Sequence, residues 1–356
     1  MKTTWRTWFL ALGAALSLTA CSDDDNYVQP IPPQPTEAGA YVLNQGSFNL
    51  VDGTLGYLNL TAGTMSTDDL FAAANEGRSM GDTPQDLVVY GSHIYLAVYG
   101  SNVVWVLDRT TRAIEQMITT EQPRDLIAAD GNVYVSNYNG YVSRIDTAQL
   151  AVDARCPVGV YPEQMAARDG YLYVVNSFGL TSDPQGCKVS KISLANFEME
   201  EQIEVGLNPT KIIADSRGNL FVIQPGDYTG ATLIKKIDST DQVTTFAEGN
   251  LIATYGDALY VATTTYNPDY TIASNDVTSY DVLTGDTLAT HVLDIPTACN
   301  PQCFTVDPSD GSFFVAGYPA SDFTGNGMVY HFASDGQLKA TYTAGLNPIA
   351  VVFDRD

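Results

Sequence analysis

The feature that most constrains the fold of this chain is an internal repeat that accounts for most of its 356 residues. Each copy contains a Gly, Asp or Asn turn followed by a short apolar strand around a central aromatic residue. These aromatics lie 39, 39, 48, 39 and 54 residues apart, at Tyr95, Tyr134, Tyr173, Phe221, Tyr260 and Phe314. This repeat length and strand content are typical of one blade of a β-propeller.

Two further elements flank the aromatic strand in each copy. Upstream, a proline opens another apolar strand, and Glu248 takes this place in the fifth copy; the prolines are Pro84, Pro123, Pro162, Pro209 and Pro301. Downstream, a third strand closes on a turn that carries an aspartate in four copies, Asp108, Asp146, Asp238 and Asp281. Since Asp side chains bond to backbone amides in turns, we expect these four to cap turns rather than to take part in catalysis.

The two ends of the repeat region complete a seventh unit. Residues 348–353 have the pattern of a first strand with nothing after it, whereas residues 40–44 and 54–58 have the patterns of a second and a third strand. Joined, they close a ring and remove the edges that an open sheet exposes. We therefore predict an all-β, seven-bladed β-propeller over residues 39–356, with its last blade closed by N- and C-terminal strands. A β-sandwich or a linear β-solenoid does not explain a unit divided between the two ends.

The residues before the repeats have the pattern of an export signal. Positive charges at Lys2 and Arg6 precede an apolar run, residues 8–20, that is too short to span a membrane permanently. It ends in Leu-Thr-Ala-Cys at Cys21, which resembles a bacterial lipobox, where residues 1–20 are removed and the cysteine is acylated. An ordinary signal peptide with an incidental cysteine is the alternative.

Residues 21–38 have the composition of an Asp- and Pro-rich linker. Its acidic start resembles a surface-export signal of gut-anaerobe lipoproteins, and a plain solvated linker is the alternative. We expect an outer-membrane protein that is lipid-anchored, faces the cell exterior and touches the membrane only through its anchor.

Several segments resemble known propellers. Residues 134–137 (Tyr-Val-Ser-Asn), 173–176 (Tyr-Val-Val-Asn) and 41–44 (Tyr-Val-Leu-Asn) are similar to the Tyr-Val-Thr-Asn repeat of YncE-like seven-bladed propellers. The opening segment, residues 44–55 followed by 80–85, resembles the BtuG surface lipoproteins of gut anaerobes. That resemblance implies cobalamin as the bound ligand, no catalytic cofactor, and a TonB-dependent outer-membrane transporter as the partner that receives it. The fifth copy lacks the proline and copies four to six lack the asparagine, so these blades are expected to contact a ligand differently from relatives.

Charge and residue types exclude several functions. The formal net charge is −24, and nucleic acids are bound through Lys and Arg, so we expect no nucleic-acid partner. The histidines His93, His291 and His331 are far apart in the sequence, which argues against a multi-histidine metal centre. No nucleophile elbow, zinc-protease motif or phosphate-binding loop is present. We expect a protein that is not an enzyme and has no metal site.

The loops between second and third strands carry the best candidates for a binding site. These loops are longer in five of the seven copies, and insertions on one face of a repeat array often mark the binding face. They supply one aromatic residue per blade: Phe48, Tyr99, Tyr138, Phe178, Tyr228, Tyr266 and Tyr318. Since Tyr and Phe offer flat, rigid contact area, we expect at least three to touch ligand. Packing between blades is the alternative for each.

Polar residues just after the repeat prolines are expected to surround the mouth of the central channel. They are Gln85, Arg124, Glu163, Lys211 and Gln302. With Asn44, Asn137 and Asn176, they are expected to face a ligand rich in amides or hydroxyls. Hydrogen bonding between blades is an equally supported alternative.

Four cysteines remain besides Cys21. An exported chain permits disulfides, and four cysteines allow three pairings. We favour Cys156 with Cys187, both near the loop face, and Cys299 with Cys303, which flank a proline at a blade entry. Four free thiols are the alternative.

Four functional hypotheses follow. The first is a surface lipoprotein that captures cobalamin or a related corrinoid for a TonB-dependent transporter, as the resemblance implies. The second is a glycan-binding propeller, because aromatic platforms suit sugar faces equally well. A lactonase-like or quinoprotein-like enzyme and a scaffold for other surface proteins are the remaining two.

Overall fold

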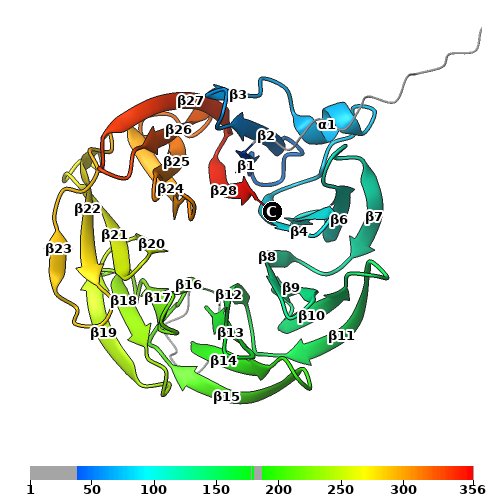
Figure 1. Cartoon of the computed structure of the whole chain (residues 1–356), viewed down its shortest axis with the longest axis horizontal. Coiled ribbons are helices and arrows are strands. Elements are labelled where there is room, and N and C mark those ends of the chain that lie inside the picture. The colour runs from blue at the N-terminus through cyan, green and yellow to red at the C-terminus, as the bar shows by residue number, and fades with distance from the viewer. Residues whose placement is uncertain (1–37, 178, 180–186, 356) are drawn as a thin grey trace, which may run out of the picture. The chain divides into compact units, whose positions relative to one another are not determined.

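The computed structural model describes residues 38–177, 179 and 187–355, which form a ring of seven antiparallel four-stranded sheets (Figure 1). The predicted seven-bladed propeller is therefore confirmed. We number the blades from β4, so that blade 7 contains the C-terminal strand β28 followed by β1, β2 and β3.

The strands take the same four positions in every blade, counted outward from the central channel. The innermost strands are β4 (Pro84–Tyr90), β8 (Pro123–Ala129), β12 (Pro162–Arg168), β16 (Lys211–Ala214), β20 (Leu251–Tyr255), β24 (Cys299–Val306) and β28 (Pro348–Asp354). The second strands are β5 (His93–Val98), β9 (Asn132–Asn137), β13 (Tyr171–Asn176), β17 (Leu220–Gln224), β21 (Ala258–Tyr266), β25 (Phe313–Pro319) and β1 (Gly39–Asn44).

The outer half of each blade completes the sheet. The third strands are β6 (Val103–Asp108), β10 (Tyr141–Asp146), β14 (Lys188–Ser193), β18 (Leu233–Ile237), β22 (Ile272–Asp281), β26 (Asn326–Phe332) and β2 (Thr54–Asn59). The outermost strands are β7 (Ile114–Thr119), β11 (Ala151–Pro157), β15 (Glu198–Glu204), β19 (Val243–Glu248), β23 (Thr287–Ala289), β27 (Leu338–Leu346) and β3 (Thr64–Met65). A five-residue helix, α1 (Leu70–Ala74), lies in the connection from blade 7 to blade 1, and no described helix is long and apolar enough to cross a membrane.

The core lies between the blades, because successive side chains of a strand point to opposite faces of its sheet. Tyr134 of blade 2 packs with Leu172 and Phe197 of blade 3, whereas Tyr173 of blade 3 packs toward Leu220 of blade 4. Each sheet therefore supplies apolar side chains to both neighbours, and the ring leaves no blade with an uncovered face.

The four repeated aspartates cap turns, as predicted. The Asp108 carboxylate accepts a hydrogen bond from the Thr111 amide at 2.6 Å, and Asp146 accepts one from the Gln149 amide at 2.8 Å. Asp238 and Asp281 bond to the turns after them in the same way.

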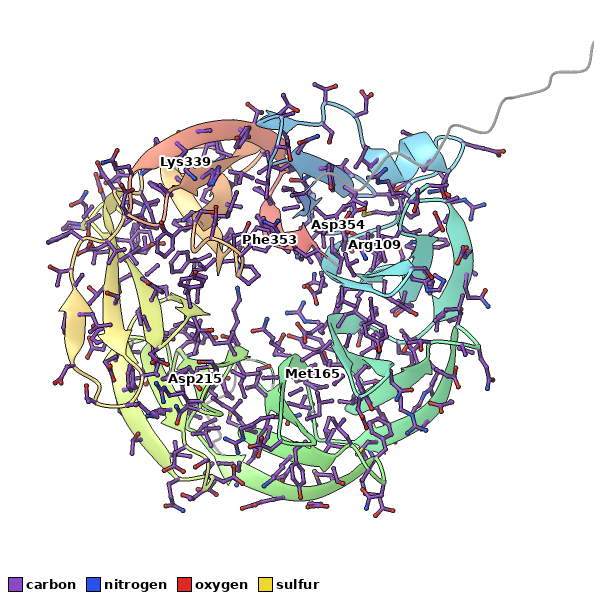
Figure 2. The ribbon with its side chains drawn as sticks, viewed as in Figure 1. Arg109, Met165, Asp215, Lys339, Phe353 and Asp354 are labelled. Carbon is purple, nitrogen blue, oxygen red and sulfur yellow. The ribbon has the colours of Figure 1, made fainter. Side chains whose placement is uncertain are left out.

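Blade 7 joins the two ends of the repeat region. β1 pairs with β28, with Tyr41 opposite Val352. An ion pair of 2.6 Å between Arg109 Nε and Asp354 Oδ1 ties β28 to blade 1 (Figure 2), and Arg355 pairs with Asp307 of blade 6. The closing strand is thus held by its sheet and by both neighbouring blades.

The fifth copy needs one correction. Tyr260 pairs with Ala253 as Tyr95 pairs with Val88, so the position of the missing proline is Gly249 and not Glu248. Glu248 instead ends the outer strand β19. A Cβ atom at Gly249 would lie 2.2 Å from a Val261 methyl carbon, so the close approach there requires glycine.

Candidate functional site

One end of the ring carries the loops between second and third strands together with the loops that enter each innermost strand; we call it the loop face. Backbone hydrogen bonds join the two loops in six blades, for example from the Tyr138 amide to the Gln122 carbonyl at 3.1 Å and from the Ser177 amide to the Tyr161 carbonyl at 3.0 Å. The innermost strands begin at this face, so the residues after the repeat prolines lie near the channel mouth.

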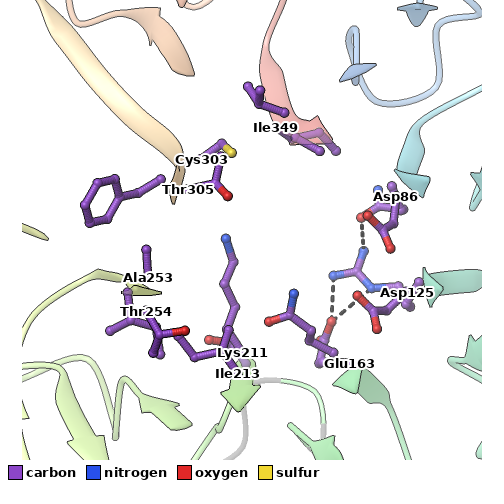
Figure 3. Close-up of a pocket in the computed structure, with 18 of the residues that line it drawn as sticks. Asp86, Asp125, Glu163, Lys211, Ile213, Ala253, Thr254, Cys303, Thr305 and Ile349 are labelled. Carbon is purple, nitrogen blue, oxygen red and sulfur yellow. Dashed lines mark hydrogen bonds and ion pairs between the residues drawn. The ribbon is translucent and has the colours of Figure 1, made fainter. Parts of the chain in front are cut away.

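The central channel holds a cavity of about 640 Å³ that is lined by innermost strands of all seven blades. Its two sides differ chemically. Strands β4, β8, β12 and β16 contribute Gln85, Asp86, Arg124, Asp125, Glu163, Gln164 and Lys211. Strands β20, β24 and β28 contribute mostly apolar groups, Ile252, Ala253, Cys303, Phe304, Ile349, Ala350 and Val351. Figure 3 shows the two sides facing each other across the channel.

Arg124 is the centre of the polar side. It donates to Glu163 Oε2 from Nη2 at 2.7 Å and from Nε at 3.0 Å, and from Nη1 to Gln85 Oε1 at 2.7 Å. Glu163 Oε1 also accepts hydrogen bonds from the hydroxyls of Tyr138 and Ser177. The predicted mouth residues of blades 1 to 3 therefore meet, and they bond to one another across blades.

Tyrosines cover this ion pair on the loop face. The Arg124 guanidinium lies 4.6 Å from the ring centroid of Tyr138 and 5.6 Å from that of Tyr99. The Tyr138 ring packs edge-on against Tyr99 at 5.6 Å and against Tyr161 at 4.9 Å. Burial, followed by the charge of Glu163, raises the pKa of the Tyr138 hydroxyl, which therefore remains a donor at neutral pH. For Tyr99 and Tyr138 the alternative of packing between blades is observed.

A second polar row lies one residue further along each strand. Asp86 Oδ2 accepts from the Leu126 amide at 2.9 Å, and Asp125 Oδ2 accepts from the Met165 amide at 2.9 Å, so each carboxyl fastens the next blade. Burial raises the pKa of both carboxyls, for Asp86 to about 7, and the neighbouring Asp86 charge raises the pKa of Asp125 further. These two groups hold protons at a pH where ordinary carboxyls have lost them.

The exposed aromatics collect on the loop face. Among the described residues eight aromatic side chains are exposed, and all but Tyr255 lie on this face: Phe48, Tyr141, Tyr161, Tyr228, Tyr266, Tyr270 and Phe323. Three of the predicted aromatics, Phe48, Tyr228 and Tyr266, are in this group. Tyr318 is half-buried, packs against Phe323 and accepts a hydrogen bond from Asn300, and Phe178 lies outside the described residues.

Four members of that group were missed by the sequence analysis. Tyr270 and Phe323 share their loops with Tyr266 and Tyr318, and a count of one aromatic per blade passed over them. Tyr161 precedes a repeat proline, which is a signal that was available. Tyr161, Tyr228 and Tyr270 have φ angles of 54°, 63° and 66°, a left-handed conformation that bulky residues rarely adopt.

The three predicted asparagines are buried at the loop face. Asn44 is 2% exposed, its amide group donates to Thr54 Oγ1 at 3.0 Å, and its Oδ1 accepts from the Gly345 amide at 3.0 Å. Asn137 is likewise buried and donates to Thr120 Oγ1 at 2.8 Å. Asn44 and Asn137 thus fasten loops of the face to the strands below. Asn176 is also buried and accepts a hydrogen bond from the Ser190 hydroxyl at 3.0 Å, whereas its amide nitrogen has no partner among the described residues. Contact of these asparagines with a ligand stays a prediction.

The two predicted disulfides are not formed, and all four cysteines are buried thiols. Cys299 and Cys303 lie in one strand, β24, where four residue intervals span about 13 Å, beyond the reach of a disulfide. Cys156 packs between blades 2 and 3, whereas Cys187 accepts a hydrogen bond from the Asn208 amide on the side of blade 4. Cys21, like the predicted signal peptide 1–20, precedes the described residues.

The histidines lie in separate surroundings. His93 pairs with Glu115 at 2.8 Å, His291 pairs with Asp276 at 2.9 Å, and His331 stacks on Phe314 at 4.3 Å between ring centroids. Over residues 38–177, 179 and 187–355 there is no group of three or more His, Cys, Asp or Glu that could hold a metal ion.

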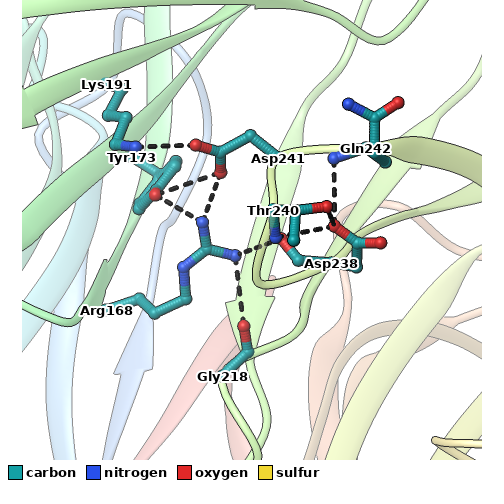
Figure 4. A network of polar contacts seen from close by, with 8 residues as sticks. All are labelled: Arg168, Tyr173, Lys191, Gly218, Asp238, Thr240, Asp241 and Gln242. Atoms are coloured by element: carbon teal, nitrogen blue, oxygen red, sulfur yellow. Dashed lines mark hydrogen bonds and ion pairs between the residues drawn. The ribbon is translucent and has the colours of Figure 1, made fainter.

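A second network joins blades 3 and 4 away from the loop face (Figure 4). Arg168 bonds to Asp241, to the Tyr173 hydroxyl and to the carbonyls of Gly218 and Asp238, and Lys191 Nζ donates to Asp241 at 2.6 Å. Its charged groups pair with one another within the network.

Comparisons with known proteins agree with the propeller fold. A family model described as "Domain of unknown function (DUF5074)" matches residues 38–312. No functionally curated protein has a significantly similar sequence.

Among solved structures, a quinonprotein alcohol dehydrogenase-like protein from Bacteroides thetaiotaomicron is 13% identical, with a TM-score of 0.67 over 90% of this chain and 79% of that one. The hydrazine synthase of Kuenenia stuttgartiensis is 15% identical, with a TM-score of 0.62 over 77% of this chain and 95% of that one. A computationally designed protein, Ika8, is 11% identical, with a TM-score of 0.56 over 86% of this chain and 88% of that one. At these identities the likeness concerns the fold alone.

Proposed function

This chain belongs to the DUF5074 family, whose description assigns no function, and we propose that it is a binding propeller that captures cobalamin or a related corrinoid on its loop face. The proposal includes a lipid anchor at Cys21, display on the outer membrane and transfer of the ligand to a TonB-dependent transporter. It does not include an enzymatic activity or a catalytic cofactor.

The observation that carries a binding role is the gathering of exposed aromatics on one face. Seven of the eight exposed aromatic side chains of the described residues lie there, and large apolar groups in water mark interaction sites when they cluster. Tyr270 is 88% exposed, Phe323 69% and Phe48 66%. Because Tyr and Phe have few rotatable bonds, they supply contact area at low entropic cost.

Backbone conformation supports the same face. Three of the exposed tyrosines are held at positive φ. Such strained conformations persist only where the surrounding structure enforces them, and they concentrate at binding and catalytic sites. Glycine adopts this conformation without the cost that a bulky side chain has, and the chain has tyrosine at all three positions.

The choice of a corrinoid rests on the sequence resemblance to BtuG together with the position of the residues that carry it. The segment 44–55 forms the loop from β1 to β2 and presents Phe48, Leu50 and Val51 to solvent on the loop face. A corrinoid is wide and carries peripheral amides, which suits a broad face of rings and loop backbone better than a deep, narrow pocket. The glycan alternative uses the same rings, since sugar faces also stack on tyrosine.

Calorimetric titration of the purified mature chain tests the proposal. Cyanocobalamin, dicyanocobinamide and a set of neutral oligosaccharides are titrated separately under the same conditions. The proposal expects saturable binding of both corrinoids at micromolar concentration or below and no heat from the sugars. Binding of an oligosaccharide alone would show that the ligand is a glycan and not a corrinoid. Binding of neither class would contradict the proposal that the loop face is a corrinoid site.

Membrane attachment has its own test. Metabolic labelling with an alkyne fatty acid is expected to mark the wild-type chain and not a Cys21→Ser variant. Protease treatment of whole cells is expected to remove the wild-type protein from the surface. A labelled variant, or a protein protected in whole cells, would contradict the anchor or its orientation.

A further inference from the structure

The central channel contains a cation, Lys211, in a row of side chains that is otherwise acidic or uncharged. The residues two places after the repeat prolines are Asp86, Asp125 and Gln164 in blades 1 to 3, and each accepts a hydrogen bond from a backbone amide of the next blade. Blade 4 has Lys211 at this position, which cannot accept such a bond. The row continues with Leu251, Cys303 and Ala350 in blades 5 to 7, so Lys211 is the position at which the row places a positive charge in the channel.

Lys211 extends from β16 across the channel toward Cys303 and Thr305 of β24 (Figure 3). Its only hydrogen bond to a described residue is to the Gln302 carbonyl at 3.4 Å, which is long for an ammonium donor. No carboxylate among the described residues lies within ion-pair distance of Lys211, although the other channel cation, Arg124, is fully paired with Glu163.

Further donors and an apolar surface surround the ammonium. Gln164 Oε1 accepts a hydrogen bond from the Ile212 amide, and the NH₂ group of Gln164 has no partner among the described residues. The Thr305 hydroxyl, which also lines the cavity, has no hydrogen-bond partner among them either. Opposite the charged strands, Ile349, Ala350 and Val351 face the cavity. An ammonium that is partly shielded from water and lacks a counter-ion favours an anion strongly.

The carboxyls of this channel make no ion pair with Lys211, although the Lys211 charge acts on Asp86: burial raises the pKa of that carboxyl, and the ammonium lowers it in part. Asp86 and Asp125 are both turned to the backbone of the next blade, and burial raises the pKa of each. The pair therefore carries less than its full negative charge near neutral pH, so it repels an incoming anion less than two ionised carboxylates would.

We infer that the channel binds a small organic carboxylate, with its carboxylate group on Lys211 and its apolar body against β20, β24 and β28. The cavity of about 640 Å³ is of the size that small-molecule sites have. The apolar wall distinguishes this ligand from a bare anion such as phosphate or acetate, which would leave that wall in water. This inference does not depend on what the loop face binds.

Hexanoate is a suitable probe, and nuclear magnetic resonance titration of the full mature chain detects it at concentrations up to about 10 mM, the weak end of specific binding. Acetate tests the apolar wall and 1-hexanol tests the charge. The inference expects hexanoate to bind at least about tenfold more tightly than either, a difference of about 1.4 kcal/mol. Equal binding of hexanoate and hexanol, or no binding of hexanoate, would overturn it.

The matched variants are Lys211→Met and Lys235→Met. Lys235 donates to Thr245 on the outer part of blade 4 and does not line the channel, so it controls for the loss of one positive charge. Hexanoate affinity is expected to fall about tenfold or more in Lys211→Met and to stay unchanged in Lys235→Met. Circular dichroism verifies folding, and Lys211→Gln replaces the first variant if methionine unfolds the chain. Unchanged affinity in a folded Lys211 variant would mean that Lys211 only balances the buried carboxyls.

Discussion

Blades 1 to 3 and blades 4 to 6 are built from the same repeat, yet they present opposite kinds of surface at the loop face. In blades 1 to 3 the polar side chains of the channel mouth bond to one another, and tyrosines pack on the Arg124–Glu163 pair. In blades 4 to 6 no such cluster forms at the mouth: blade 4 places Lys211 in the channel, the walls of blades 5 and 6 are mainly apolar, and rings such as Tyr266, Tyr270 and Phe323 extend into solvent.

The difference separates the part of the face that stabilises the ring from the part that is available for binding. Every polar atom that a ligand would need from Arg124 or Glu163 is already used by a neighbouring blade. The rings of blades 4 to 6 and the ammonium of Lys211 have few such partners. We therefore expect mutations in the first group to change stability and mutations in the second group to change affinity.

The largest effect is expected from Arg124→Met. The variant leaves the Glu163 carboxylate buried without its counter-charge, and removal of one partner of such a pair costs about 3 kcal/mol of unfolding free energy. Denaturation in guanidinium chloride measures it. Arg144→Met is the matched control, because its ion pair with Asp153 is partly exposed and contributes less than about 1 kcal/mol. Equal losses of unfolding free energy in the two variants would contradict the stabilising role of the Arg124 cluster in blades 1 to 3.

Combined replacement of Tyr266 and Phe323 by alanine tests the binding half. We expect cyanocobalamin affinity to fall about tenfold or more, because exposed rings at the centre of an interface carry much of its energy. The unfolding free energy is expected to change by less than about 1 kcal/mol, since both rings are mainly in solvent. Tyr255→Ala removes an exposed aromatic side chain from the face of the propeller opposite the loop face, and it should leave the affinity for cyanocobalamin unchanged. An equal loss in that control would place the ligand elsewhere.

The buried carboxyls of the polar half predict a pH dependence. The folded-state pKa of Asp86 is raised to about 7, whereas an unfolded aspartate titrates near 4, so the folded chain binds the proton more tightly. The stability that this group contributes is fully present below about pH 4 and is lost as the pH rises through about 7. Asp86→Asn keeps an acceptor for the Leu126 amide and removes the titration.

The melting temperature of Asp86→Asn, measured relative to wild type, is therefore expected to rise between pH 5 and pH 8. Asp153→Asn is the control, because the hydrogen bonds and charge of Arg144 lower the pKa of Asp153, so its difference from wild type is expected to stay constant between pH 5 and pH 8 and to change only in more acid solution. A constant difference between Asp86→Asn and wild type at all pH values would contradict the assignment.

The smallest effect is expected from Tyr270→Gly. Glycine relieves the left-handed backbone at φ 66°, so the unfolding free energy is expected to rise slightly, by about 0.5 kcal/mol, while ligand affinity falls. Asp130→Gly, at φ 45° in a turn away from the loop face, should change stability similarly and leave affinity alone. A gain in stability with unchanged affinity in both variants would mean that the strained tyrosine has no binding role.

The fold could be predicted because the repeat fixes both the strand pattern and its closure; two of the third strands, β6 and β10, end at Asp108 and Asp146, the aspartates predicted at their closing turns. The Arg124 cluster joins residues that are 39 positions, or one repeat, apart. The repeat therefore predicted that these residues lie close together, but it did not predict the hydrogen bonds between them. The direction of its side chain decides whether a residue at the channel mouth bonds to the next blade or faces the channel. That direction cannot be read from a single sequence.

The disulfide prediction was wrong because of the local backbone. Cys299 and Cys303 were expected to flank a proline at a blade entry, whereas β24 begins at Cys299 and runs through both. The bonds of the Asn44 side chain to Thr54 and to the Gly345 amide could not be predicted either, because they depend on how the loop folds back on the strand. In both cases the local backbone determines what the side chain contacts.

Hydrogen–deuterium exchange with and without cyanocobalamin tests the central claim, that the loop face of blades 4 to 6 is the binding surface. We expect the ligand to slow exchange in the loops 225–232, 267–271 and 320–325. We also expect little change in the Arg124 cluster, whose groups are already bonded, and none at the opposite end of the blades. Binding that protects the opposite end, or that leaves these three loops unchanged, would contradict it.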